Sequence, residues 1–177
     1  MVEITLTILL QIVQTVGILV GVYYYIMSLQ NQSRTRQAQL FMQLFQDFIS
    51  AEMNKIHLDL VKMEWEDYHD FEMKYGSDYN LDSAAKRLGH LQWFNGVGLL
   101  LKQNLINMDL VYPTVGEGAM EIWTKFESTI REQRVRYSIP EWNVWFEYLV
   151  DEVRKIRRIK GLPTEPKETF GSYVPDK

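Results

Sequence analysis

The sequence predicts an all-α protein in which one N-terminal transmembrane helix continues into a cytoplasmic bundle of four to five helices, followed by an extended C-terminal tail. The N-terminus is a charge-free apolar run, and apolar residues recur with helical period through most of the remaining chain. Sustained period-two alternation and hairpin-type turn dipeptides are both missing from the sequence. The expected divisions are a membrane anchor over residues 1–33, a helical domain over 34–160 and a Pro-containing tail over 161–177.

The apolar run covers residues 4–27, and no charged residue occurs between Glu3 and Arg34. A helix over residues 4–25 would be about 33 Å long, which matches the hydrocarbon core of a bilayer. A cleaved signal peptide needs a basic segment before the apolar run and a small-residue cleavage site after it, and neither is found here. We therefore expect an uncleaved anchor; a buried helix of a soluble protein is the alternative.

The residues that flank the apolar run predict its orientation in the membrane. Lys and Arg collect on the cytoplasmic side of a span. None precedes the run, whereas Arg34 and Arg36 follow it, so we expect the N-terminus outside and the helical domain in the cytoplasm. Tyr23 and Tyr24 lie near the inner end of the run, where interfacial tyrosines sit at headgroup depth.

One face of the predicted span carries polar and small residues that are spaced alternately four and three positions apart, as on one stripe of a helix. The amide groups of its glutamines cost free energy if they face lipid tails, and its glycine pair permits close helix approach. We expect this face to pack against other transmembrane helices, either of further copies or of a larger membrane complex. The alternative is a lone anchor whose glutamines tolerate the membrane. The predicted packing residues are Thr7, Gln11, Gln14, Gly17, Ile18, Gly21 and Tyr25.

The polar stretch after the span contains no Pro or Gly, so the first helix is expected to continue to about Ile49. Further helices are expected over residues 53–63, 65–75, 81–104 and 116–137. Gly76 is expected to end the helix over residues 65–75. Asn107 is expected to cap a short turn that Pro113 closes.

The last helix is expected to begin at a capping box formed by residues 138–141 and to end at Gly161. The two glycines of the segment Gly96-Val97-Gly98 lie inside a helical pattern, which indicates close helix packing rather than a phosphate-binding loop.

Composition and motifs favour no catalytic chemistry. The chain has no cysteine and a net charge of −4, which disfavours thiolate chemistry and nucleic-acid binding. No Gly-x-Ser-x-Gly elbow or Gly-rich loop with Lys-Ser or Lys-Thr is present. Glu66 and His69 have the spacing of a di-iron half-site, but the second pair that such a site needs is missing. His57 and His90 are interpreted as surface or satisfied core residues. We therefore expect no enzyme, no cofactor and no metal.

Two further groups of residues are candidates for contacts. The basic residues near the end of the last helix either interact with its C-terminus and water or contact anionic lipid headgroups. Phe170 and Tyr173 are the candidate docking residues of the tail, because aromatic side chains are enriched at contacts. The candidate lipid-contacting residues are Arg154, Lys155, Arg157, Arg158 and Lys160.

The order of several segments within residues 34–158 resembles a known family. The segments are residues 94–101 (FNGVGLLL), 105–112 (LINMDLVY), Ile122-Trp123, residues 131–136 and residues 145–149 (WFEYL). The chain resembles small bacterial and archaeal proteins that have one N-terminal span and a cytoplasmic helical domain and are grouped as a domain of unknown function. The resemblance implies this architecture and topology and no catalytic residue.

Three functions are consistent with these features. The favoured one is a non-enzymatic, membrane-anchored helical protein that acts by assembly, as an accessory or structural subunit of a membrane complex or as a homo-oligomeric scaffold. The second is a ligand- or lipid-responsive sensor that signals through the long N-terminal helix and needs a pocket between the aromatic helices. The third is a metal-dependent enzyme that uses Glu66 and His69.

Overall fold

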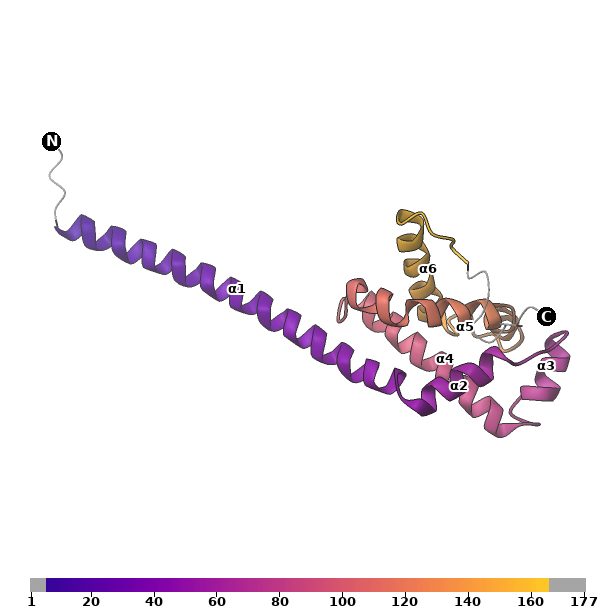
Figure 1. Cartoon of the computed structure of the whole chain (residues 1–177). Helices are drawn as coiled ribbons and strands as arrows, with labels where there is room; N and C mark the ends of the chain where they lie inside the picture. The colour runs from indigo at the N-terminus through magenta and orange to yellow at the C-terminus, as the bar shows by residue number, and fades with distance from the viewer. Residues whose placement is uncertain (1–5, 166–177) are drawn as a thin grey trace, which may run out of the picture. The chain divides into compact units, whose positions relative to one another are not determined.

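Six helices and no strand occur among residues 6–165, which are the residues that the computed structural model of the protein describes. The predicted all-α class is therefore confirmed for this part of the chain. The chain divides into two units, one up to Gln39 and one from Leu40 onward. The helices are α1 (Leu6–Phe48), α2 (Ala51–Val61), α3 (Tyr68–Tyr75), α4 (Leu81–Lys102), α5 (Met108–Arg136) and α6 (Val144–Ile159) (Figure 1).

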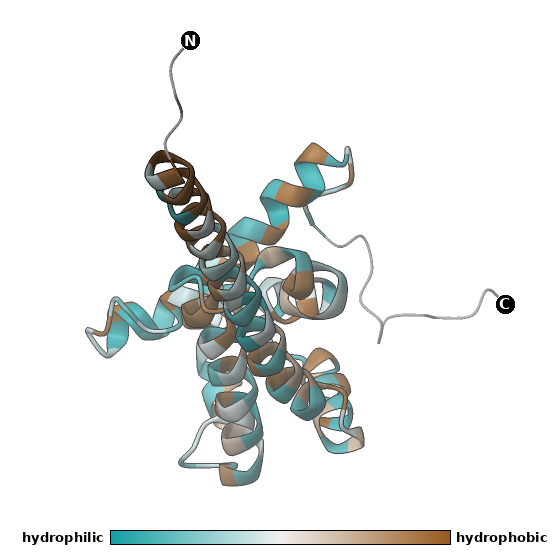
Figure 2. Cartoon of the chain, turned by 90° about the vertical axis from the view of Figure 1, so that its left-hand side faces the viewer, coloured by the Kyte–Doolittle hydropathy of each residue, from teal (hydrophilic) through white to brown (hydrophobic). Residues whose placement is uncertain are grey.

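Helix α1 is continuous over 43 residues, so the predicted end near Ile49 is confirmed. Its N-terminal turns are mostly apolar, brown with some teal in Figure 2, and their large apolar side chains are exposed. By length and composition, α1 is the one helix among residues 6–165 that could cross a membrane.

An apolar core lies inside the second unit, to which the last turns of α1 and helices α2 to α6 contribute. Aromatic rings make up much of it: Phe94 stacks on Phe146 with ring centroids 5.0 Å apart, and Trp123 meets Phe146 edge to face at 5.1 Å. Near the end of α1, Phe48 stacks on Trp93 of α4 at 4.8 Å. Because each such ring removes a large apolar area from water, these contacts hold the helices in place.

Helices α4 and α6 approach each other closely at Gly98. A Cβ atom at this position would lie 1.8 Å from the carbonyl oxygen of Trp145, so only glycine fits. A Cβ atom at Gly96 would have no neighbour within 4 Å. The predicted packing role is therefore confirmed for Gly98 and does not extend to Gly96.

Four helices begin at a residue whose side-chain oxygen accepts a hydrogen bond from a backbone N–H three positions later. This contact satisfies one of the amide groups that the first helical turn leaves without a partner. The predicted cap at Asn107 is among them and is confirmed. The four residues are Ser50, Asp67, Asn80 and Asn107, before α2, α3, α4 and α5 respectively.

The predicted break at Pro113 is wrong, because α5 runs through this proline from Met108 to Arg136. The expected short turn and the helix expected to start at residue 116 are therefore one helix. Pro113 lies in the second turn, where it cannot donate the helical hydrogen bond to the carbonyl of Asp109 and its ring crowds that carbonyl, so the helix continues at a cost. Val111 and Val115 on either side are fully buried, and their burial stabilises the helical path.

The predicted capping box at residues 138–141 is also wrong, because α6 begins at Val144. Ser138 has a left-handed φ of 53° and continues the turn that ends α5. The first amides of α6 are capped from another helix: Oδ1 of Asn95 on α4 accepts hydrogen bonds from the backbone N–H groups of Trp145 and Phe146, at 3.1 and 3.2 Å.

The remaining helix ends differ less from the prediction. α2 ends at Val61 instead of residue 63. α3 begins at Tyr68 instead of Trp65, because Asp67 caps it. α6 ends as predicted, with Gly161 at a φ of 67°. The backbone N–H of Gly161 donates to the carbonyl of Arg158, and that of Leu162 donates to the carbonyl of Arg157, which is a Schellman motif.

Candidate functional site

The predicted packing face of the span lies along one stripe of α1, and every residue of it is exposed. Neither Gly17 nor Gly21 has an atom within 4 Å of where a Cβ would lie, so the backbone there is open to a close neighbour. Thr15 donates a hydrogen bond of 2.8 Å from its hydroxyl to the carbonyl of Gln11 in the preceding turn, which satisfies that hydroxyl without water. The packing itself stays a prediction.

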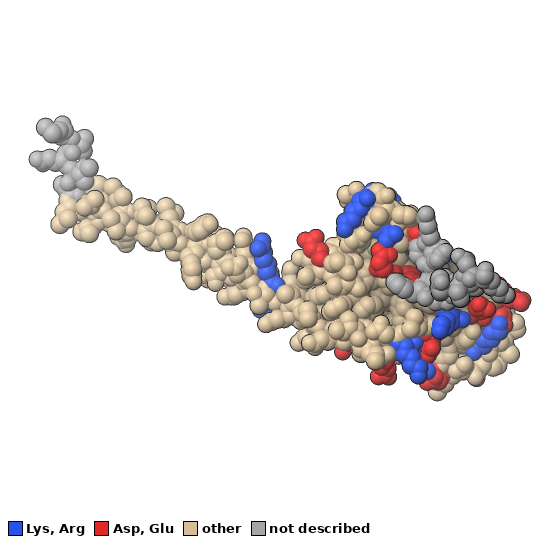
Figure 3. Space-filling model, viewed as in Figure 1, with Lys and Arg blue, Asp and Glu red and all other residues tan. Residues whose placement is uncertain are grey.

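The predicted interface residues follow the same helix. Tyr23 and Tyr24 are exposed, and Arg34 and Arg36 are the first charged residues after them. Figure 3 accordingly shows no blue or red side chain along the outer part of α1 and blue ones only toward its second half. Arg34 lies ten positions after Tyr24, which corresponds to about 15 Å along a helix, so the tyrosines and arginines occupy successive depths.

Most of the predicted lipid-contacting residues have partners within the chain. Arg154 pairs with Glu165 at 2.8 Å, and Lys155 pairs with Glu152 at 2.6 Å. Arg157 is paired with Glu117, and the ammonium of Lys160 lies 4.1 Å from the centre of the Tyr112 ring. These contacts neutralise much of the cluster. Arg158 is exposed and forms no ion pair with residues 6–165.

The two residues of the predicted metal-like pair are both exposed, and Glu66 precedes the start of α3. Glu66 and His69 therefore do not share a helical face. In the part of the chain that the structure describes, no group of three or more His, Asp or Glu side chains is arranged to hold a metal ion. The predicted docking residues of the tail, Phe170 and Tyr173, lie outside the described residues.

A buried chain of polar side chains connects α2, α4 and α5. His57 Nε2 lies 3.0 Å from Oε2 of Glu121, and His57 Nδ1 lies 3.1 Å from Nε2 of His90. At the other end, Nδ1 of His90 lies 3.0 Å from the sulfur of Met53. His57 and His90 are thus satisfied core residues, one of the two interpretations made from the sequence.

The contacts among Met53, His90, His57 and Glu121 determine where the protons of the two histidines lie. A thioether sulfur only accepts, so His90 donates from Nδ1 to Met53 and accepts at Nε2 from the Nδ1–H of His57. The remaining proton lies between Nε2 of His57 and the carboxylate of Glu121. Burial, with the neighbouring His57 as a smaller cause, lowers the pKa of His90 to about 3, which agrees with a neutral His90.

Sequence reasoning missed the partnership of these residues. His57 and His90 are 33 positions apart and belong to different helices, so no local spacing connects them. A usable signal was Glu121, an acidic residue within the apolar run Ala119-Met120-Glu121-Ile122-Trp123. A carboxylate at such a position requires a buried partner.

Comparison with protein-family models, with curated proteins and with solved structures gives no match to this chain. The resemblance to single-span proteins with a helical domain therefore stays a prediction.

Proposed function

We propose that this chain is a non-enzymatic, single-span membrane protein that acts by assembly, either as an accessory or structural subunit of a membrane complex or as a homo-oligomeric scaffold. Its partners are membrane lipids and other transmembrane helices, of its own copies or of a larger complex. In this arrangement the N-terminus lies outside and the helical domain lies in the cytoplasm.

The observation that carries the proposal is the outer part of α1. Its apolar side chains are exposed, and among them a stripe presents the amides of Gln11 and Gln14 beside the open backbone at Gly17 and Gly21. A single helix in lipid leaves those amides without partners, whereas a second helix on this face supplies them. The second unit has its own core and needs no membrane to bury it.

The first test is native mass spectrometry of the full chain, extracted from membranes in mild detergent. We expect either a homo-oligomeric mass or a larger mass that contains other chains. A monomer that carries no other chain contradicts the proposal.

Matched variants locate the contact on the stripe. Gly17→Leu with Gly21→Leu fills the open backbone and is expected to lower the assembled fraction. Val16→Leu with Val20→Leu adds bulk on the side of the helix opposite Gln11 and Gln14 and is expected to leave the assembled fraction unchanged. Equal effects of the two double variants would place the contact elsewhere.

The orientation is tested by cysteine labelling, which is clean because the chain has no native cysteine. In intact cells, a membrane-impermeant maleimide is expected to label a Val2→Cys variant and to leave an exposed Glu141→Cys variant unlabelled until the membrane is opened. The reverse pattern would invert the proposed topology.

A second candidate is the ligand-responsive sensor. A pocket of about 180 Å³ between the end of α5 and α4, lined by Arg87, favours it. The continuity of α1 from Leu6 to Phe48 gives such a sensor a single helix through which to signal.

A further inference from the structure

Arg87 on α4 is a buried cation, and its Nε–H has no hydrogen-bond partner among residues 6–165. The residue is 3% exposed, and its guanidinium carbon lies 4.7 Å from the centre of the Phe71 ring. Its Nε is buried without a hydrogen-bond partner, and no ion pair joins the guanidinium to an acidic residue within residues 6–165. Stacking on Phe71 stabilises the charge but satisfies none of its N–H groups, which is costly in a buried site.

The positive charge of Arg87 is partly offset by nearby groups that form no ion pair with it. Burial lowers the pKa of Arg87, and the nearby Glu72 carboxylate, followed by Tyr68 and Tyr137, acts in the opposite direction. An arginine stays protonated under such conditions. The site therefore holds a permanent cation with an unpartnered Nε–H donor.

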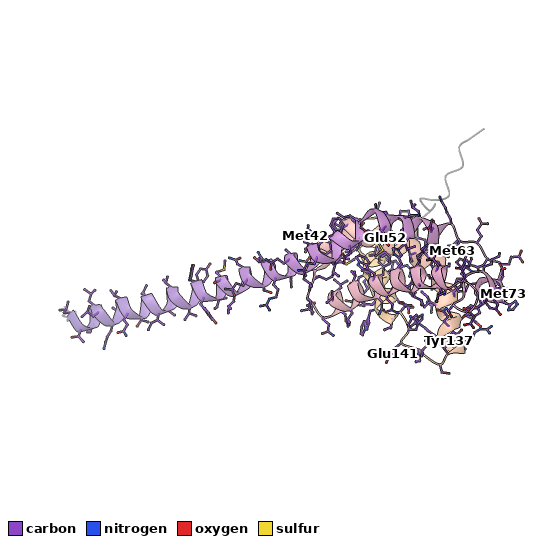
Figure 4. All side chains as sticks on the ribbon, turned by 90° about the horizontal axis from the view of Figure 1, so that it is seen from below. Met42, Glu52, Met63, Met73, Tyr137 and Glu141 are labelled. Atoms are coloured by element: carbon purple, nitrogen blue, oxygen red, sulfur yellow. The ribbon has the colours of Figure 1, made fainter. Side chains whose placement is uncertain are left out.

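Arg87 borders a pocket that has both polar and apolar walls. Besides Arg87, the polar lining includes Ser77, Gln133 and Tyr137. Oε1 of Gln133 accepts a hydrogen bond of 3.2 Å from Nε1 of Trp142, which leaves the Gln133 amide group as a donor. Tyr137 lies at the end of α5, before the turn that carries Glu141 (Figure 4).

The apolar wall and the size of the pocket restrict what fits. Leu88 and Trp142 line it together with Ala84 and Ile139. Its volume of about 180 Å³ is below the range of about 300–1,000 Å³ for pockets that hold drug-sized ligands, so the occupant is small. Glu72 also lines the pocket, and its negative charge disfavours a dianion such as phosphate more than a monoanion.

We propose that this pocket binds a small organic carboxylate, with the carboxylate on the guanidinium of Arg87 and the apolar body against Leu88 and Trp142. Planar carboxylates match the fork of N–H donors that arginine presents. The inference goes beyond assembly through α1, because a ligand in this pocket binds whether or not the chain assembles.

The test is saturation-transfer NMR on the purified full chain in detergent, with sodium acetate, butyrate and benzoate as probes and butyramide as the neutral match of butyrate. At least one carboxylate is expected to bind saturably, with butyrate about tenfold or more tighter than butyramide, as one charge-assisted contact provides. Binding of inorganic phosphate without any carboxylate, equal binding of butyrate and butyramide, or no saturable binding of the three acids would each overturn the proposal.

Two variants assign the binding to this pocket. Arg87→Met is expected to weaken binding about tenfold or more, and Lys86→Met, at a partly exposed neighbouring residue paired with Asp82, is expected to leave it unchanged. If Arg87→Met fails to fold, the butyrate and butyramide pair still tests the proposal on the unaltered chain. A monomeric chain that binds butyrate would contradict only the assembly proposal, and an assembled chain that binds no acid would contradict only this one.

Discussion

Leu10 in α1 and Leu91 in α4 are the same residue in the same type of helix, yet Leu10 is 60% exposed and Leu91 is 1% exposed. The contrast extends to whole elements. α6 is amphipathic, with Phe146 and Val153 buried and Lys155 exposed, as expected of a helix between a core and water. The outer part of α1 is apolar over most of its circumference, apart from the stripe that carries Gln11 and Gln14, as expected of a helix surrounded by lipid or by other helices. The comparison teaches that the second unit buries its apolar side chains within the chain, whereas the apolar side chains of the outer part of α1 stay exposed.

Charge follows the same division. No charged residue occurs in α1 before Arg34. In the second unit, charges pair locally, as where Arg134 contacts Glu147 at 2.6 Å and Arg131 contacts Glu127 at 2.7 Å. The largely exposed Arg131–Glu127 pair contributes little stability by itself. The main contribution to the free energy of unfolding of this unit is therefore assigned to its core.

The largest expected difference between the two units comes from the same leucine-to-alanine substitution made in each of them. Leu91→Ala is expected to lower the free energy of unfolding by about 2–5 kcal/mol, because it leaves a cavity in the core. Leu10→Ala is expected to change it by less than about 0.5 kcal/mol. Denaturant titration followed by tryptophan fluorescence measures this, because all five tryptophans lie in the second unit. A large loss from Leu10→Ala would contradict the exposure of the outer part of α1.

Two glycines in α4, Gly98 at the contact with α6 and Gly96 beside open space, are expected to respond differently to the same substitution. Gly98→Ala is expected to cost about 1–3 kcal/mol, since the new methyl group meets the carbonyl of Trp145 on α6. Gly96→Ala, two positions away, is expected to stabilise by about 0.5–1 kcal/mol, because alanine is the better helix former and the space is open. Similar effects of the two changes would contradict the close approach of α4 and α6.

The buried histidine makes the stability of the second unit depend on pH. His90 has a pKa of about 3 when folded and about 6.5 when unfolded, so below pH 6.5 the unfolded chain binds one more proton. The stability contributed by neutral His90 is complete above this pH and is lost as the pH falls, by up to about 1.4 kcal/mol per pH unit.

The measurement is the free energy of unfolding between pH 6.5 and 5, for the natural chain and for two variants. His90→Gln is expected to remove most of this slope, and His69→Gln, at an exposed histidine, is expected to retain it. An unchanged slope in His90→Gln would assign the dependence to another group.

The elements that could be predicted from the sequence are those set by local pattern. The charge-free run and the absence of Pro or Gly after it predicted α1 to within one residue of Phe48. Gly161 predicted the end of α6, because a left-handed residue at that position is a local requirement. Leu91, Phe94 and Phe126 occupy apolar positions that recur with helical period in the sequence, and each is buried.

Features that depend on residues from distant segments could not be predicted in this way. Pro113 signals a break locally, yet burial of the valines beside it stabilises the helix through it. The contact between His57 and His90 and the pocket at Arg87 need the fold before they can be seen. The proposed packing face of α1 is the opposite case, since it follows from local spacing alone.

The start of α6 gives the smallest expected effect and contrasts a local cap with a tertiary one. Asn95→Ala is expected to cost about 1 kcal/mol of unfolding free energy, because two backbone N–H groups of α6 lose the oxygen that accepts from them. Glu141→Ala is the matched control, since this exposed residue would matter only if residues 138–141 formed a capping box. It is expected to change the free energy by less than about 0.5 kcal/mol. Denaturant titration of both variants distinguishes the two caps: a larger loss from Glu141→Ala than from Asn95→Ala would restore the local capping box, whereas the reverse order means that α4 fixes where α6 begins.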